Sequence, residues 1–214
     1  MSELDKTKID AFWKSRTEID NPRIATHYKQ DDTHEYDLAL IRKYLKPTTH
    51  LLDMGCGTCF LSNQLIGDVA HIVAVDKYKE FLQHAVSSPK IETIASDLLN
   101  YSDDRKYDVI IMFGVANFFN DAELMKLYSF CASHLSDEGV FIVKHTCGIQ
   151  EDVVIDNYSE QIGQHYHAIY RLDSREQKML ESVFSDVCKV DIYPERLNPW
   201  PNTHFYAFVC KQNN

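Results

Sequence analysis

A short glycine-containing turn follows an apolar run and could bind a nucleotide-type cofactor. The run ends in Asp53, and Gly55 and Gly57 follow it with only Cys56 between them. Glycines let the backbone pass close to a bound ligand, because they have no side chain and adopt conformations that other residues avoid. A nicotinamide dinucleotide fingerprint would need a third glycine at position 60, where this chain has Phe60. The turn therefore argues against a pyrophosphate at this point and leaves other nucleoside cofactors open.

Two further acids stand at the ends of the next two apolar runs. Asp76 ends the second run, 23 residues after Asp53, and Asp97 follows the third run, 21 residues later. An acid in the first of these places can accept hydrogen bonds from both hydroxyls of a ribose. A carboxylate in the second place, or the backbone beside it, can bind the edge of an adenine. In the plainer alternative, Asp53 and Asp76 only cap helices of an α/β domain.

The elements that position these residues alternate between strands and helices. Runs rich in β-branched and aromatic residues predict strands, and amphipathic stretches predict the helices between them. This alternation favours a parallel sheet with helices on both faces. The predicted strands are 50–54, 71–75, 91–95, 108–112, 139–144, 187–193 and 203–211, and the predicted helices between the first five are 60–66, 79–87, 98–101 and 121–135.

Two segments lie outside this alternation. The N-terminal segment predicts helices at 5–18 and 32–45 with a break at Asn21-Pro22, and an ordered segment after the fifth strand is too long for an ordinary connection. The helix that follows this segment is expected at 174–184, with Asp173 or Ser174 as its cap. We therefore expect one domain over residues 1–214, divided into a helical cap (1–46), a cofactor-binding half (48–145), a lid insertion (146–172) and a C-terminal helix with strands (173–214).

These features together resemble the class I S-adenosylmethionine-dependent methyltransferases. The glycine turn, Asp76, Ser96-Asp97 and Tyr107-Asp108 occur in the order and at the spacing of that family. The resemblance is strong over about residues 48–145. It implies an α/β fold, a Rossmann-like seven-stranded and mostly parallel sheet with helices on both faces, whose last strand runs antiparallel.

The resemblance also implies S-adenosyl-L-methionine as the cofactor. Gly55 and Gly57 would pass beside its methionine part, while Asp76 would hold the ribose and Asp97 with Leu98 the adenine. Cys59 is a departure from the family pattern, because the family usually has a third glycine at this position. The larger side chain would set the next helix slightly further from the strand. A relative that transfers an aminopropyl group from the same pocket is the alternative. The full set of expected cofactor-binding residues is Asp53, Gly55, Cys56, Gly57, Asp76, Lys77, Asp97, Leu98 and Phe113.

The absence of certain motifs argues against several classes of methyl acceptor. Members that methylate amino groups of DNA or protein carry Asn/Asp-Pro-Pro-aromatic after the fourth strand, where this chain has residues 114–119 without a proline. Cytosine-5 enzymes need a Pro-Cys nucleophile, which the chain does not contain. Metal-dependent members place acids after the fourth strand, and none occurs between Met112 and Asn120. A small molecule is therefore the expected acceptor, and no metal is expected.

Several polar residues are candidates for the acceptor site. His145 ends the fifth strand, where it could act as the general base that an alcohol acceptor needs, whereas an amine acceptor needs only to be neutral. Tyr170-Arg171 resembles an aromatic–Arg pair found in the lids of small-molecule members, so Arg171 would anchor an anionic or hydroxyl-rich group. Alternatively, Arg171 pairs with Asp173 or Glu176. The expected substrate-binding residues are His27, Tyr28, Tyr166, His167, Tyr170 and Arg171.

Composition limits the partners and the compartment. The net charge is −10 and the bases do not cluster, which argues against a nucleic-acid partner. The longest mostly apolar run is 109–119, too short to span a membrane. Since the first residues are polar, no secretory signal is expected and the location is predicted to be cytoplasmic, as a monomer or homodimer. The six cysteines are then reduced thiols, and the C-x-x-C spacing of Cys56 and Cys59 lacks a second metal-binding pair.

The functional prediction is methyl transfer from S-adenosylmethionine to a small acceptor. We expect O-methylation of a sugar or a similar polar metabolite, because histidines gather near the predicted crevice. The alternatives are N-methylation of a small amine and a cofactor-binding subunit that has no catalytic role itself.

Overall fold

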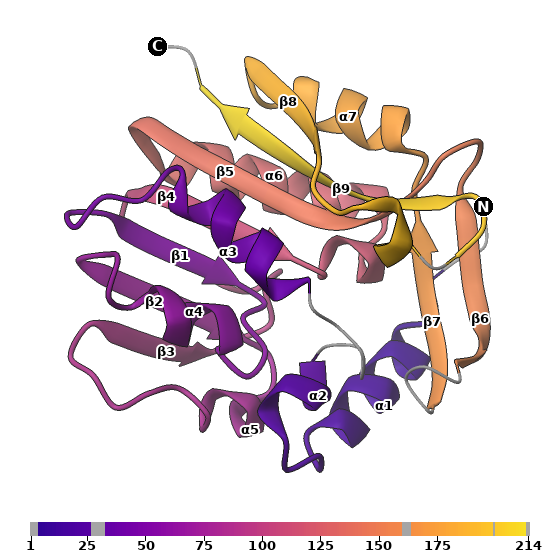
Figure 1. The fold of residues 1–214 in the computed structure, drawn as a ribbon, viewed down its shortest axis with the longest axis horizontal. Helices are drawn as coiled ribbons and strands as arrows, with labels where there is room; N and C mark the ends of the chain where they lie inside the picture. The colour runs from indigo at the N-terminus through magenta and orange to yellow at the C-terminus, as the bar shows by residue number, and fades with distance from the viewer. Residues whose placement is uncertain (1–3, 27–32, 160–163, 199, 213–214) are drawn as a thin grey trace.

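The predicted sheet forms in the computed structural model, which describes residues 4–26, 33–159, 164–198 and 200–212. Its seven strands follow the order β3-β2-β1-β4-β5-β9-β8, and the first five run parallel (Figure 1). The last strand along the chain, β9, is antiparallel to both of its neighbours. The predicted fold class is thus confirmed. The strands of the sheet are β1 (His50–Met54), β2 (His71–Asp76), β3 (Ile91–Ala95), β4 (Tyr107–Phe113), β5 (Leu135–Gly148), β8 (Asp186–Asp191) and β9 (Thr203–Lys211).

Helices cover both faces of the sheet. Figure 1 shows α3 and α4 in front of the strands and α6 behind them. Some helix starts follow local signals: Asn120 caps α6 by accepting a hydrogen bond from the backbone N–H of Glu123, and the Glu123 side chain accepts from Asn120 in return. The helices are α1 (Lys6–Arg16), α2 (Pro22–Thr26), α3 (His34–Arg42), α4 (Phe60–Leu65), α5 (Lys79–Leu82), α6 (Asp121–His134) and α7 (Asp173–Glu181), with short 3₁₀ turns at η1 (Ala116–Phe118) and η2 (Glu195–Leu197).

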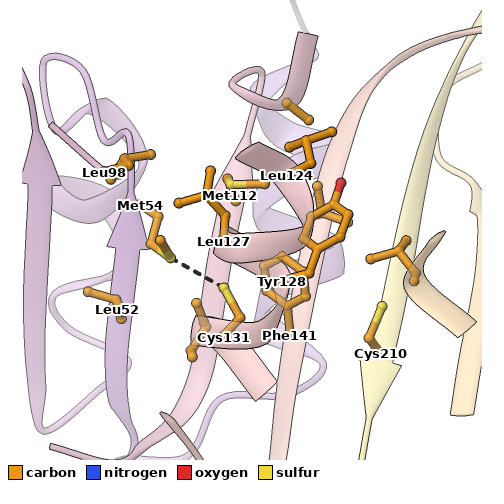
Figure 2. Close-up of a cluster of buried hydrophobic side chains, with 14 of the residues drawn as sticks. Leu52, Met54, Leu98, Met112, Leu124, Leu127, Tyr128, Cys131, Phe141 and Cys210 are labelled. Atoms are coloured by element: carbon orange, nitrogen blue, oxygen red, sulfur yellow. Dashed lines mark hydrogen bonds between the residues drawn. The ribbon is translucent and has the colours of Figure 1, made fainter. Parts of the chain in front are cut away.

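The core lies in two layers because successive side chains of a strand point to opposite faces of the sheet. On the face covered by α6 and α7, Leu52 and Met54 pack against Leu127 and Cys131 (Figure 2). The Cys131 thiol lies 3.4 Å from the Met54 sulfur. On the other face, alternate strand residues such as Leu51 pack against α3 and α4. The sheet is therefore buried on both faces, which fits the nearly continuous apolar runs in the sequence.

Two local predictions were wrong, and one helix was missed. Residues 98–101 do not form the predicted helix, because the Asp97 side chain accepts a hydrogen bond from the backbone of Leu99 in a turn. The chain does break before Pro22, but Pro22 also starts the short helix α2, which was not predicted, since proline is favoured in the first turn. Neither Asp173 nor Ser174 caps α7, whose N-cap is Leu172.

The segment predicted as a lid insertion is a β-hairpin. Strands β6 (Val153–Ser159) and β7 (Gln164–Tyr170) pair with each other in a separate two-stranded sheet. The hairpin packs on α1, where Phe12 meets Tyr166 at 5.3 Å between ring centroids. Lys8 on α1 also forms a salt bridge of 2.8 Å to Asp156 on β6. The N-terminal helix and the hairpin thus form one structural unit, which we call the cap.

The hairpin begins with a tight backbone approach at Gly148. Its N–H donates a hydrogen bond of 2.8 Å to the Arg171 carbonyl, and a Cβ added at Gly148 would overlap the Glu151 carbonyl oxygen. We predict that Gly148→Ala lowers the free energy of unfolding by about 2–4 kcal/mol, in the range of overpacking and strain effects. Urea denaturation measures this. Gly67→Ala is the matched control, because a Cβ there has no neighbour within 4 Å. Equal stability of the two variants would contradict the prediction.

Candidate functional site

A central cavity of about 450 Å³ lies at the carboxyl ends of the parallel strands. Helices α1 and α2 supply one side of it, and the ends of β1, β2, β4 and β5 supply the other. Open α/β sheets bind their ligands at this edge. All nine residues expected to bind the cofactor line this cavity: Asp53, Gly55, Cys56, Gly57, Asp76, Lys77, Asp97, Leu98 and Phe113.

The glycine turn is held in place by Asp76. One carboxylate oxygen accepts the backbone N–H of Gly57 at 2.9 Å, and the other accepts the N–H of Tyr78 at 2.9 Å. Gly55 and Gly57 have φ of +77° and +52°, a region that favours glycine. A Cβ at Gly57 would lie 2.6 Å from the Thr26 methyl group, so helix α2 also needs glycine there.

Cys59 keeps the left-handed backbone that a third glycine would adopt. Its φ is +56°, its side chain is fully buried, and α4 begins at the next residue. Its sulfur lies 3.7 Å from that of Cys56. Burial and the hydrogen bond with Cys59 raise the pKa of the Cys56 thiol well above its usual value. The Cys56 thiol therefore stays protonated, which is a poor starting point for redox chemistry.

Asp53 is a buried acid at the floor of the cavity. Burial raises its pKa to about 7, although the Ser62 hydroxyl donates a hydrogen bond of 2.6 Å to it and opposes the shift. The negative charge of Asp76 raises the pKa further. Near neutral pH, this carboxyl group therefore exchanges its proton readily and can accommodate a cationic ligand.

The raised pKa of Asp53 predicts a pH-dependent stability. A carboxyl group with a higher pKa in the folded state stabilises the fold at low pH, and the effect is lost as pH rises through about 7. Between pH 5 and pH 8 the ligand-free protein should lose about 2–3 kcal/mol of unfolding free energy from this group. The Asn side chain of the Asp53→Asn variant stays neutral at both pH values. This variant should therefore lack that part of the change in unfolding free energy with pH. Urea denaturation at both pH values tests this. An equal change in unfolding free energy in the wild-type and Asp53→Asn proteins would contradict the prediction.

An ion-pair network connects helix α1 of the cap to residues that are predicted to bind the cofactor. Lys77, beside Asp76, donates to Asp10 of α1 at 2.7 Å and lies 3.5 Å from Asp97. Trp13 of α1 packs edge-on against Phe118 at 5.3 Å and closes the cavity on its apolar side. The N-terminal helix thus covers the place where a nucleoside would lie.

A buried polar cluster, formed by Asp37, Lys144 and Tyr193, lines another part of the cavity. The Lys144 ammonium donates to Asp37 at 3.0 Å and to the Tyr193 hydroxyl at 2.7 Å, and that hydroxyl donates to Asp37 at 2.6 Å. The sequence prediction missed this cluster. The signal that could have found it is a lysine at the end of a buried strand, where a charge needs a partner.

The sequence alone also relates this chain to known proteins. Residues 51–139 match the model of a family described as a methyltransferase domain. These residues therefore form a methyltransferase domain. No curated protein matches the sequence of this methyltransferase.

Solved structures share the fold of the methyltransferase at low sequence identity. DhpI bound to S-adenosylhomocysteine has 15% identity and a TM-score of 0.72, and the match covers 100% of each chain. A SAM-dependent methyltransferase from Leishmania major has 17% identity and a TM-score of 0.73, covering 98% of this chain and 86% of that one. A 1,6-didemethyltoxoflavin-N1-methyltransferase from Burkholderia thailandensis has 10% identity and a TM-score of 0.69, with coverages of 98% and 87%. At these identities the likeness shows the fold.

His145 of the methyltransferase lines the cavity but its ring is held on the far face of the sheet. It follows Lys144 on β5, so the two side chains leave opposite faces. Its imidazole lies 3.7 Å from the buried Glu176 of α7, and the Tyr128 hydroxyl donates to the same carboxylate. Burial raises the pKa of Glu176, but His145, Tyr128 and Arg171 outweigh burial and hold it below its usual range. A general-base role for His145 stays a prediction.

Arg171 is not placed as the predicted acceptor anchor. It is almost completely buried, does not line the cavity, and pairs with Asp121 at 2.8 Å instead of with Asp173 or Glu176. Its remaining N–H groups donate to the carbonyls of Ala116 and Phe119. Arg171 therefore fixes the loop after β4 to the hairpin.

The other predicted acceptor residues divide between the cavity and the cap. Tyr166 lines the cavity, whereas His167 and Tyr170 do not. His167 accepts a hydrogen bond from the backbone of Asp5, which places it between α1 and the hairpin. His27 and Tyr28 lie outside the described residues.

This structural role makes Arg171 a stability determinant. Arg171→Met removes the donor to one Asp121 carboxylate oxygen and to two backbone carbonyls, although Arg175 still pairs with the other Asp121 oxygen, so it should cost about 3–5 kcal/mol of unfolding free energy. Arg42→Met breaks an exposed pair with Asp68 and should cost less than about 1 kcal/mol. Chemical denaturation compares the two. A stable Arg171 variant with weakened acceptor binding would instead restore the anchor role.

No three His, Cys, Asp or Glu side chains in the described part of the chain are placed to hold a metal ion. Metal-independent activity remains a prediction. In the same described residues, no helix is long and apolar enough to cross a membrane.

Proposed function

We propose that this methyltransferase transfers the methyl group of S-adenosylmethionine to an oxygen of a small polar molecule. The observation that supports this most is that one cavity of about 450 Å³ is lined both by the residues expected to bind the nucleoside and by the polar cluster. Cavities of this size are typical of small-molecule sites. Because α1 and its aromatic side chains cover the opening near the cofactor residues, the cavity fits a small acceptor better than a polymer.

The acids around the cavity fit a cationic cofactor. Asp53, Asp76 and Asp97 all line it, and Asp97 also lies 3.5 Å from Lys77. The other lining acids, Asp10, Asp37 and Glu123, are each paired with a lysine. S-adenosylmethionine carries a sulfonium, an ammonium and one carboxylate, so its net charge is positive. We assign Asp76 to the ribose and the Asp97–Leu98 turn to the adenine. When bound, the cofactor would supply an electrophilic methyl group, and the protein would contribute positioning and exclusion of water.

The acceptor is proposed to bear a hydroxyl group, as a sugar or a similar polar metabolite does. The polar cluster of Asp37, Lys144 and Tyr193, which lines the same cavity, is a suitable partner for such groups. N-methylation of a small amine is the second candidate, because the Burkholderia thailandensis structure is of an N-methyltransferase. A subunit that binds the cofactor without catalysis would show binding and no transfer.

The cofactor assignment predicts the effect of removing one carboxylate. Asp76→Ala should weaken S-adenosylhomocysteine binding by about 10- to 100-fold, because two ribose hydroxyls lose a charged acceptor. Isothermal titration calorimetry measures this. Asp104→Ala is the control, since Asp104 is exposed and lies outside the cavity. Equal affinity of the two variants would mean that the ribose is bound elsewhere.

The acceptor class is tested with methyl-labelled S-adenosylmethionine. Incubation with separate sugars, phenols, hydroxy acids and amines, followed by mass spectrometry of the products, reports which atom receives the label. Labelled ethers or esters support the proposal, whereas labelled amines alone support the second candidate. Cofactor binding with no labelled product favours the non-catalytic subunit. Transfer of an unlabelled aminopropyl group from decarboxylated S-adenosylmethionine, with the methyl label left on methylthioadenosine, would identify the other use of this pocket.

A further inference from the structure

We propose that Lys144 is the residue that selects an oxygen acceptor, by donating a hydrogen bond to an ionisable oxygen such as that of a phenol, enol or carboxylic acid. This inference rests on the proposed function, because it assigns a residue and a substrate class to the same cavity. Lys144 would touch the acceptor, while Asp37 and Tyr193 would act as positioning residues.

The ammonium of Lys144 is fixed by its two partners. It has three N–H donors, and its hydrogen-bond partners among the described residues are Asp37 at 3.0 Å and Tyr193 at 2.7 Å. These two partners also bind each other at 2.6 Å, so the three side chains hold one another in a closed ring of hydrogen bonds. A side chain with high rotamer freedom is thereby ordered before any ligand arrives.

The exposed part of Lys144 faces the cavity. Its side chain is 11% exposed, whereas that of Asp37 is 1% exposed. The ammonium lies 5.1 Å from the ring centre of Phe113 and 5.9 Å from that of Phe205, and both rings line the same cavity. The third donor is therefore directed among aromatic rings, where a flat acceptor with an oxygen at its edge would fit.

A merely structural cluster would be costly in this place. Burying an ion pair gains little stability over apolar side chains of similar size, because both charges lose their hydration. Here the pair joins α3 to β5 at the end of the strand, although the helix already packs through apolar residues such as Leu38 and Ile41. A charge that remains at the cavity surface is better explained by a ligand that needs it.

The donor discriminates between acceptor atoms. An amine binds a proton in neutral solution and then meets Lys144 as one donor against another, and the neutral amine that can react has a single lone pair, which the methyl group needs. A phenolate, enolate or carboxylate presents lone pairs and a negative charge, and its proton has already gone to solvent. The acceptor oxygen then bonds to the methyl carbon, the carbon–sulfur bond breaks, and its electron pair remains on the sulfur. No proton has to move within the site in that step.

The test uses four aromatic probes of similar size: phenol, benzoate, benzyl alcohol and benzylamine. Each is incubated with the full chain and methyl-labelled S-adenosylmethionine, and kcat and KM are measured. Wild-type protein should methylate phenol or benzoate at least 10-fold faster than benzylamine, in kcat/KM. Lys144→Met should lower kcat/KM for the accepted oxygen probe by about 10- to 100-fold, mainly by raising KM, because a charge-assisted hydrogen bond is lost.

Two further variants separate this role from folding. The double change Asp37→Asn with Lys144→Met removes both buried charges together, so it avoids leaving one unpaired, and it should also lose the preference for oxygen. Lys144→Arg should restore part of it, since a cationic donor returns. Lys189→Met, whose lysine pairs with Asp173 outside the cavity, should behave as wild type.

Calorimetry with S-adenosylhomocysteine distinguishes failure of the proposed function from failure of the role of Lys144. If the wild-type protein does not bind S-adenosylhomocysteine, the proposed function itself is overturned. With binding intact, three results would overturn only the role of Lys144: no transfer to any oxygen probe, equal or faster transfer to benzylamine, or an unchanged kcat/KM in the Lys144→Met and double variants. Loss of transfer in His145→Gln with unchanged kinetics in Lys144→Met would likewise move the acceptor contact to His145.

Discussion

The pair of hydrogen bonds that Asp76 accepts is the contact on which the site depends. It joins the end of β2 to the glycine turn after β1, so two strand ends that are distant in sequence become one surface. The turn can accept this position only because Gly57 has a positive φ. Thr26 then packs against the same glycine, and Pro22 accepts a hydrogen bond from Thr58 at 2.8 Å. One carboxylate thus fixes the floor of the cavity and the place of α2 above it.

The alternation of side chains along β5 explains why two neighbouring polar residues have different surroundings. Lys144 points to the face of α3 and reaches Asp37, while His145 points to the face of α6 and α7 and reaches Glu176. Both groups need partners because the sheet is buried on both faces. The sheet therefore contains two buried polar side chains at neighbouring positions, and both of them line the cavity.

The parts predicted correctly from sequence were those that depend on local signals. The strands, the glycine turn and the acids at strand ends follow from periodicity and spacing, and all nine cofactor residues share one cavity. The partners of Arg171 and Lys144 could not be predicted, because they come from segments 50 and 107 residues away along the chain. Pairing at such distances is decided by packing. The same is true of the hairpin, whose strands were hidden in a segment that showed only excess length and aromatic residues.

The cap shows how such a long segment can affect the cavity without lining most of it. Only Tyr166 of the predicted acceptor residues in the hairpin reaches the cavity, and it does so beside Phe12 of α1. The rest of the hairpin holds α1 through contacts such as the pair between Lys8 and Asp156. Helix α1 in turn reaches Lys77 through Asp10. Hairpin and helix are more than 130 residues apart in sequence, yet together they form one wall of the cavity. A change in the hairpin would therefore act on the site through the position of α1.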